Sequence, residues 1–80
     1  MTEERLKKAN ELSENIKMYQ KEIKSWEMAK NFTGRKISLK SDDTDYEVKT
    51  NFINFEVMKA LTLDRLKKDL DALETEFKNL

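Results

Sequence analysis

Residues 63–80 read LDRLKKDLDALETEFKNL, and an apolar side chain recurs in this stretch at alternating steps of three and four residues. These residues, the C-terminal seam, are Leu63, Leu66, Leu70, Leu73, Phe77 and Leu80. Such steps place side chains along one face of an α-helix, and a continuous apolar face needs a second helix to cover it. We therefore predict a helix at residues 54–80, with Asn51 or Asn54 as its N-cap.

A matching apolar stripe lies near the start of the chain. This N-terminal seam consists of Ala9, Leu12, Ile16, Tyr19, Ile23 and Trp26. Thr2 is suited to cap the helix that carries the seam, and Gly34 is free to adopt the positive φ that often ends a helix. We predict this helix at residues 2–31, packed antiparallel against the second helix.

Residues 35–50 change from a helical to a strand-like pattern. Apolar and polar residues alternate from Lys36 to Lys40 and again from Tyr46 to Thr50, and a polar cluster typical of a turn, Ser41–Asp45, separates the two runs. We predict a β-hairpin at residues 35–50. Because two strands alone are marginally stable in water, the hairpin should lean on the helices or pair with a second copy of the chain.

The predicted fold is a single, mainly α domain at residues 1–80, an antiparallel, coiled-coil-like helical hairpin with the β-hairpin between its helices. Further apolar residues lie outside the main stripes, and a two-helix fold would leave them in water. They are Leu6, Met18, Met28, Phe55, Met58 and Leu61. Exposed apolar groups usually mark an interface, so we predict a multi-helix homo-oligomer, most simply a two-fold dimer with four packed helices.

Composition excludes several classes of protein. Basic and acidic residues balance at sixteen each, and the chain has neither cysteine nor histidine. The balance disfavours nucleic-acid binding, which depends on neutralising phosphates, and the missing residue types disfavour a zinc site. No apolar run approaches the roughly 20 residues of a membrane span, and Met1–Glu4 has no apolar signal core. We expect a cytoplasmic protein without membrane contact.

The acidic turn does not match a calcium-binding loop. A loop that began at Asp42 would need glycine at its sixth position and glutamate at its twelfth, where the chain has Glu47 and Ile53. A solvated β-turn is therefore the favoured interpretation of Asp42, Asp43 and Asp45. We predict no metal and no cofactor.

Catalysis is equally disfavoured. The serine hydroxyls have no histidine to activate them, and no cysteine nucleophile exists. A two-helix hairpin also lacks a sheltered cleft for acid–base work by carboxylates. We predict that the protein is not an enzyme and has no catalytic residues.

Basic and aromatic residues gather in and beside the predicted β-hairpin. The candidate ligand-binding residues are Arg35, Lys36, Lys40, Trp26, Phe32 and Tyr46. Cations hold phosphate by charge-assisted hydrogen bonds and flat rings stack on bases, so we expect a small anionic nucleotide between subunits. The alternative is structural: the lysines would guard a strand edge against aggregation, and the aromatic rings would fill the core.

The segments RKISLK (residues 35–40) and LDRLKKDLDAL (residues 63–73) resemble in texture small uncharacterised phage-encoded proteins with a helix, a β-hairpin and a second helix. Some small phage proteins of that kind assemble into oligomers that sequester nucleotide immune signals or block host defence proteins. The resemblance implies an anti-defence role for this chain, at the level of architecture.

Two functions are therefore expected. The first is a non-enzymatic, oligomeric binding protein that captures a small anionic nucleotide signal or blocks a host protein. The alternative is a structural assembly module in which the coiled coil itself is the function and no small ligand is bound.

Overall fold

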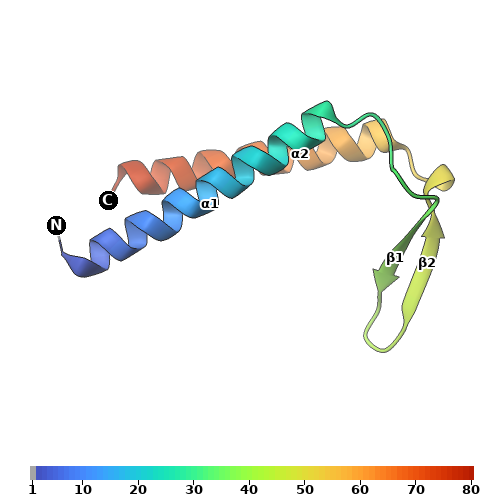
Figure 1. The fold of residues 1–80 in the computed structure, drawn as a ribbon, viewed down its shortest axis with the longest axis horizontal. Helices are drawn as coiled ribbons and strands as arrows, with labels where there is room; N and C mark the ends of the chain where they lie inside the picture. Colours follow the sequence, from blue (N-terminus) through green and yellow to red (C-terminus); the bar gives the residue numbers. More distant parts are fainter. Residues whose placement is uncertain (1) are drawn as a thin grey trace.

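The computed structural model describes residues 2–80 as two long helices joined by a β-hairpin (Figure 1). In chain order the elements are α1 (Glu3–Met28), β1 (Lys36–Lys40), β2 (Asp45–Lys49), a 3₁₀-helix (Thr50–Phe52) and α2 (Phe55–Lys78). The mainly helical architecture and the place of the β-hairpin between the helices are confirmed. The predicted domain also included Met1, which lies outside the described residues.

Side-chain caps fix the start of each helix. The Thr2 hydroxyl accepts a hydrogen bond from the Arg5 N–H at 3.3 Å, and the Asn54 Oδ1 accepts one from the Val57 N–H at 3.2 Å. Each cap satisfies a backbone donor that the first turn of a helix cannot pair. Asn54, one of the two predicted candidates, is therefore the cap of α2.

The predicted end of the first helix is wrong. The helix α1 ends at Met28, three residues early, with Ala29 in an extended conformation, and Gly34 does not adopt a positive φ. The physical reason is a cap from the other helix: the Lys59 ammonium donates hydrogen bonds to the carbonyl oxygens of Glu27 and Ala29. These bonds satisfy carbonyl oxygens at the end of the helix. In a left-handed glycine cap, backbone N–H groups after the helix would donate to such carbonyls instead.

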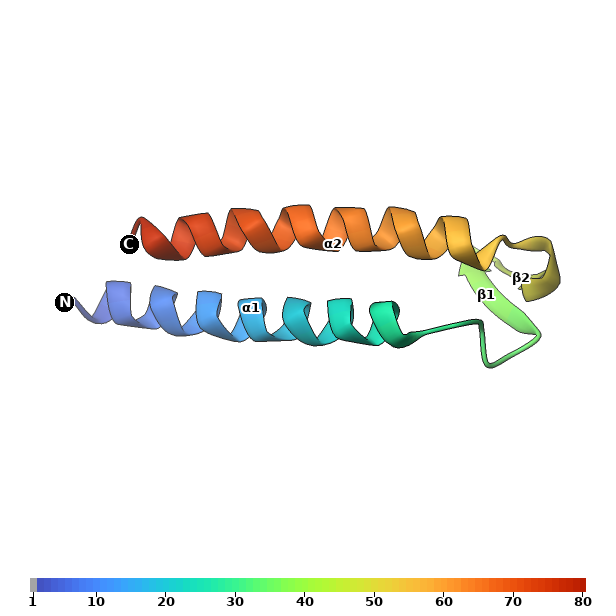
Figure 2. The same cartoon turned by 90° about the horizontal axis from the view of Figure 1, so that it is seen from above.

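The two helices lie side by side and antiparallel (Figure 2). All six residues of the N-terminal seam are at least half-buried, and Leu12 and Ile23 are fully buried. In the C-terminal seam the four leucines are half-buried, whereas Phe77 and Leu80 are exposed. The predicted seams therefore meet, although α2 contributes no fully buried residue.

Strand β1 pairs with β2 in antiparallel register. Ile37 lies opposite Val48 and Leu39 opposite Tyr46, so these four apolar side chains share one face of the ribbon. The predicted five-residue turn has four residues, since Asp45 belongs to β2 and pairs with Lys40.

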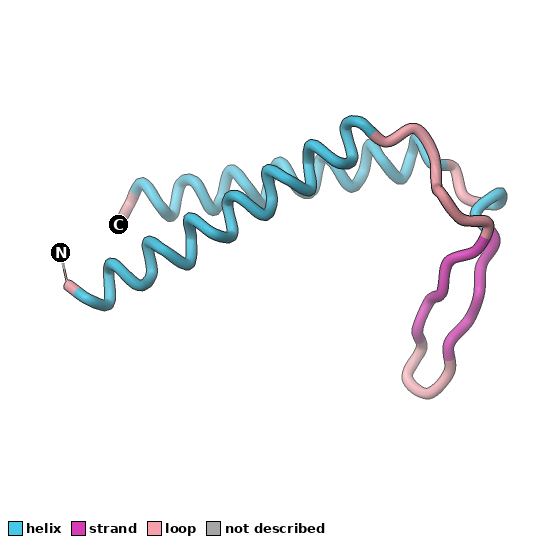
Figure 3. The backbone as a smooth tube through the Cα atoms, in the orientation of Figure 1, coloured by secondary structure: helices cyan, strands magenta, loops and turns pink. Residues whose placement is uncertain are grey.

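Thr50 closes the base of the β-hairpin. Its hydroxyl donates to the Gly34 carbonyl at 2.8 Å, and its N–H donates to the Arg35 carbonyl at 2.9 Å. Beyond this base the strands project away from the helix pair, and their contacts with the helices are sparse (Figure 3). The expectation that the hairpin leans on the helices holds only near its base, and pairing with a second copy stays a prediction.

The protomer is thin and extended. Its principal dimensions are 51 × 32 × 17 Å, and the shortest is about one and a half times the width of one helix. It exposes 7094 Å² of surface, whereas a compact monomer of 9.5 kDa exposes about 5,000 Å².

Candidate binding surfaces

An open groove runs between α1 and α2 on one side of the helix pair. It consists of two hollows that share Tyr19 and Asp69. The apolar residues of this helix groove are Met18, Tyr19, Leu61, Leu66, Ala72 and Leu73. Met18 is 55% exposed and Leu61 is 68% exposed, although both are large apolar side chains. Polar residues such as Arg65 and Asp69 also line the helix groove, so its exposed apolar surface is concentrated at Met18 and Leu61.

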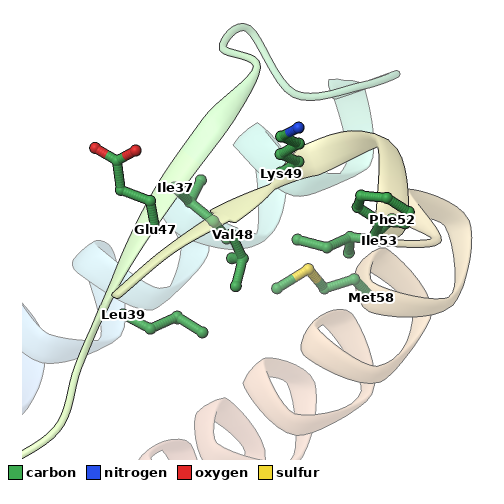
Figure 4. A pocket seen from close by; sticks show the side chains of 8 residues that line it. All are labelled: Ile37, Leu39, Glu47, Val48, Lys49, Phe52, Ile53 and Met58. Atoms are coloured by element: carbon green, nitrogen blue, oxygen red, sulfur yellow. The ribbon is translucent and has the colours of Figure 1, made fainter. Parts of the chain in front are cut away.

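A second apolar hollow, the hairpin cleft, lies between the β-hairpin and the start of α2. Figure 4 shows Leu39 and Val48 extending from the strands toward the side of α2 that carries Met58. The hollow measures about 610 Å³, and its walls include Ile37 and Ile53. Phe52, from the 3₁₀-helix, stands at its edge with 82% of its surface exposed.

The hairpin cleft and the helix groove lie next to each other along α2. Met58 lines the hairpin cleft, and Leu61, one turn further along α2, lines the helix groove. Residues three apart on a helix are neighbours on its surface. Apolar side chains of α2 therefore line both hollows.

A basic cleft occupies the base of the β-hairpin. Its walls are Arg35, Lys36, Lys49, Thr50 and Asn51, and none of them is acidic. Lys36 and Lys49 lie directly opposite each other in the register, an arrangement of like charges that destabilises a sheet. A nearby carboxylate, that of Glu47, reaches Lys36 at 3.4 Å. This excess of positive charge makes the basic cleft suitable for an anion.

Three aromatic rings pack where α1 leads into the loop. The centroids of Trp26 and Phe55 lie 6.0 Å apart, and Phe32 meets Phe55 edge-on at 5.0 Å. Trp26, Phe32 and Phe55 are each half-buried. This aromatic cluster anchors the loop after α1 on the first turn of α2.

The structure divides the six candidate ligand-binding residues among four places. Arg35 and Lys36 both line the basic cleft, and Trp26 and Phe32 both belong to the aromatic cluster. Lys40 lies opposite Asp45 at the far end of the strands, on the polar face of the ribbon. Tyr46 lies on the opposite, apolar face. The six residues therefore do not converge within one protomer, and a site between subunits stays a prediction.

Two residues outside the candidate set acquire roles in the structure. Lys49 adds a third cation to the basic cleft, and it lies opposite Lys36 because the turn has four residues and not the predicted five. Lys59 caps α1 from across the helix pair. Its sequence signal is its position, since it precedes Leu63 by four residues and so occupies the C-terminal seam, where an apolar residue is the norm.

Within residues 2–80, no group of three or more acidic side chains is placed to hold a metal ion. Neither of the described helices combines the length and the apolar character that crossing a membrane requires.

Comparison of the chain with protein-family models, with curated proteins and with solved structures found no match.

Proposed function

We propose that this chain is a non-enzymatic, self-assembling binding module whose thin helix pair is completed by another copy of itself. The main support for the proposal is that the protomer exposes more surface than a compact chain of its mass. The protomer exposes 7094 Å², which is about 2,000 Å² more than a compact chain of its mass. A stable homodimer buries roughly 1,000 Å² or more on each subunit, so one interface accounts for much of the surplus.

The chemistry of the surplus surface supports the same conclusion. Leu61 and Met18 stand open in the helix groove, and Phe52 stands open beside the hairpin cleft. Burying such side chains stabilises an assembly by roughly 1.5–3 kcal/mol each. Two helix pairs packed face to face form a four-helix arrangement, which would also enclose the half-buried leucines of α2.

The proposal is tested by measuring the number of subunits in a variant of the helix groove and in a control variant with the same added charge elsewhere. Leu61→Glu places a charge in the helix groove, while Asn10→Glu adds the same charge on an exposed position of α1 outside the seam. Light scattering at micromolar concentration should give an oligomer for the parent and for Asn10→Glu, and a smaller species for Leu61→Glu. A parent protein that is folded and monomeric would contradict the proposal.

A second function, capture of a small anionic ligand, is favoured by the basic cleft. Arg35, Lys36 and Lys49 line it together, although the like-charge pair weakens the sheet. This version corresponds to the nucleotide-sequestering, anti-defence role implied by the resemblance to phage proteins. The stacking rings that it requires would have to come from a neighbouring subunit, since none lines the cleft.

Calorimetry with a panel of linear and cyclic nucleotides tests the second function. Binding to the parent should fall at least tenfold in Lys49→Gln and stay unchanged in Lys24→Gln, which removes a charge from the exposed face of α1. Absence of heat with every nucleotide, for a protein that is folded by circular dichroism, would exclude this version and leave the assembly function.

A further inference from the structure

We propose that two copies pair antiparallel, so that the hairpin cleft of each copy receives the open apolar end of its partner. The open end is the end of the helix pair that carries Leu6, Phe77 and Leu80. This inference rests on the self-assembly proposed above, and it adds the occupant of the hairpin cleft and the orientation of the two chains.

The positions of the two apolar ends provide the geometric argument. The β-hairpin lies at one end of the helix pair, and both chain termini lie at the other (Figures 1 and 2). The helix α1 has 26 residues and is about 39 Å long, so one protomer cannot bring its own hairpin to its own open end. A two-fold axis perpendicular to the helices places each hairpin beside the partner's open end, twice in one dimer.

The apolar side chains at these two ends are exposed and unmatched within the protomer. Leu39 and Phe52 border the hairpin cleft with more than half of their surfaces exposed. At the open end Leu6 is 54% exposed and Phe77 is 41% exposed. Antiparallel pairing covers the hairpin cleft of each copy with the open end of the other, whereas a parallel dimer would pair hairpin with hairpin and open end with open end.

The charges along the helix pair favour the same orientation. Residues 3–16 and 70–78, which lie at the open end, contain seven acidic and four basic residues. Residues 17–30 and 55–69, which lie nearer the hairpin, contain eight basic and five acidic residues. The segments at the two ends therefore have net charges of −3 and +3, the latter including Lys30 in the loop after α1. Antiparallel pairing brings unlike charges together, and parallel pairing brings like charges together.

Disulfide cross-linking between single-cysteine variants tests the orientation, because the native chain has no cysteine. Leu39→Cys and Phe77→Cys are purified separately, mixed, allowed to exchange subunits and oxidised. A disulfide between positions 39 and 77 can then form only between chains. Phe52→Cys with Leu80→Cys is a second pair, in which the native side chains are already exposed and their loss perturbs the protomer little.

The expected result is a mixed disulfide in at least one of the two pairs, at several times the yield of a mixture of Phe77→Cys and Lys24→Cys. Subunit mass is measured on the same samples before oxidation. A dimer that forms disulfides between two copies of Leu39→Cys, and none in either mixed pair, would overturn the antiparallel arrangement while self-assembly stands. A folded monomer would overturn both.

Discussion

The Nζ atom of Lys59 lies 2.9 Å from the carbonyl oxygen of Ala29, so a side chain of α2 caps the end of α1. The same ammonium group lies 3.2 Å from the carbonyl oxygen of Glu27. Last-turn carbonyls of a helix have no partner within the helix, and a cation satisfies both their hydrogen bonds and the negative end of the helix dipole. This contact ties the two helices together beside the aromatic cluster.

Replacing Lys59 should therefore destabilise the protein. Lys59→Met keeps an unbranched stem of nearly the same length and removes both hydrogen bonds, so we expect a loss of roughly 1–2 kcal/mol in the free energy of unfolding. The control is Lys67→Met, which removes only an exposed ion pair to Glu27 at 4.0 Å and should cost less than about 1 kcal/mol. Urea unfolding of both variants at one protein concentration measures the difference. Equal costs would show that the cap contributes nothing.

Gly34→Ala should be neutral or stabilising. Gly34 has no positive φ, and an added Cβ would meet the Lys36 carbonyl oxygen at 3.6 Å, an ordinary van der Waals distance. The substitution narrows the conformations of the unfolded chain, which is expected to raise the free energy of unfolding by about 0.4–1 kcal/mol. Thermal unfolding gives the sign directly. A lower melting temperature for the variant would indicate the left-handed glycine cap that the sequence suggested.

The base of the β-hairpin should depend on the hydroxyl group of Thr50. Thr50→Val keeps the shape and the backbone hydrogen bond to Arg35 but removes the 2.8 Å hydrogen bond to the Gly34 carbonyl. We expect a cost of about 1 kcal/mol, expressed as faster amide hydrogen exchange in β1 and β2. Thr50→Ser retains the hydroxyl and should exchange like the parent. Unchanged exchange in the valine variant would contradict this role.

The free-energy cost of replacing a seam leucine by alanine indicates whether a partner covers that leucine. Leu70 is only half-buried in the protomer, and a fully buried leucine costs roughly 2–5 kcal/mol when changed to alanine. If a partner completes the burial, Leu70→Ala should reach that range at concentrations where the protein is assembled, and should cost less on dilution. Denaturant unfolding over a range of protein concentrations measures both values. A small cost that does not change with concentration would indicate a seam that stays open to water.

The sequence predicted the elements that depend on local pattern. The spacing of apolar residues at three and four positions predicted both helices, and the alternation of apolar and polar residues predicted the β-hairpin. Asn54 lay at one of the two positions where a cap was expected. The end of α1 was not predictable in this way because its cap, Lys59, comes from thirty residues further along the chain. Tyr46 lies on the opposite face of the ribbon from Lys36 and Lys40. The candidate residues were chosen by residue type and by closeness in the sequence, which does not distinguish the two faces of a strand pair.

If a second copy covers the surplus apolar surface of this thin protomer, the unmodified protein is at least a dimer. Sedimentation equilibrium at micromolar concentration measures this. We expect a species of twice the 9.5 kDa chain mass, or a higher multiple, which dissociates on dilution. A single species of 9.5 kDa with full helical circular dichroism would contradict it.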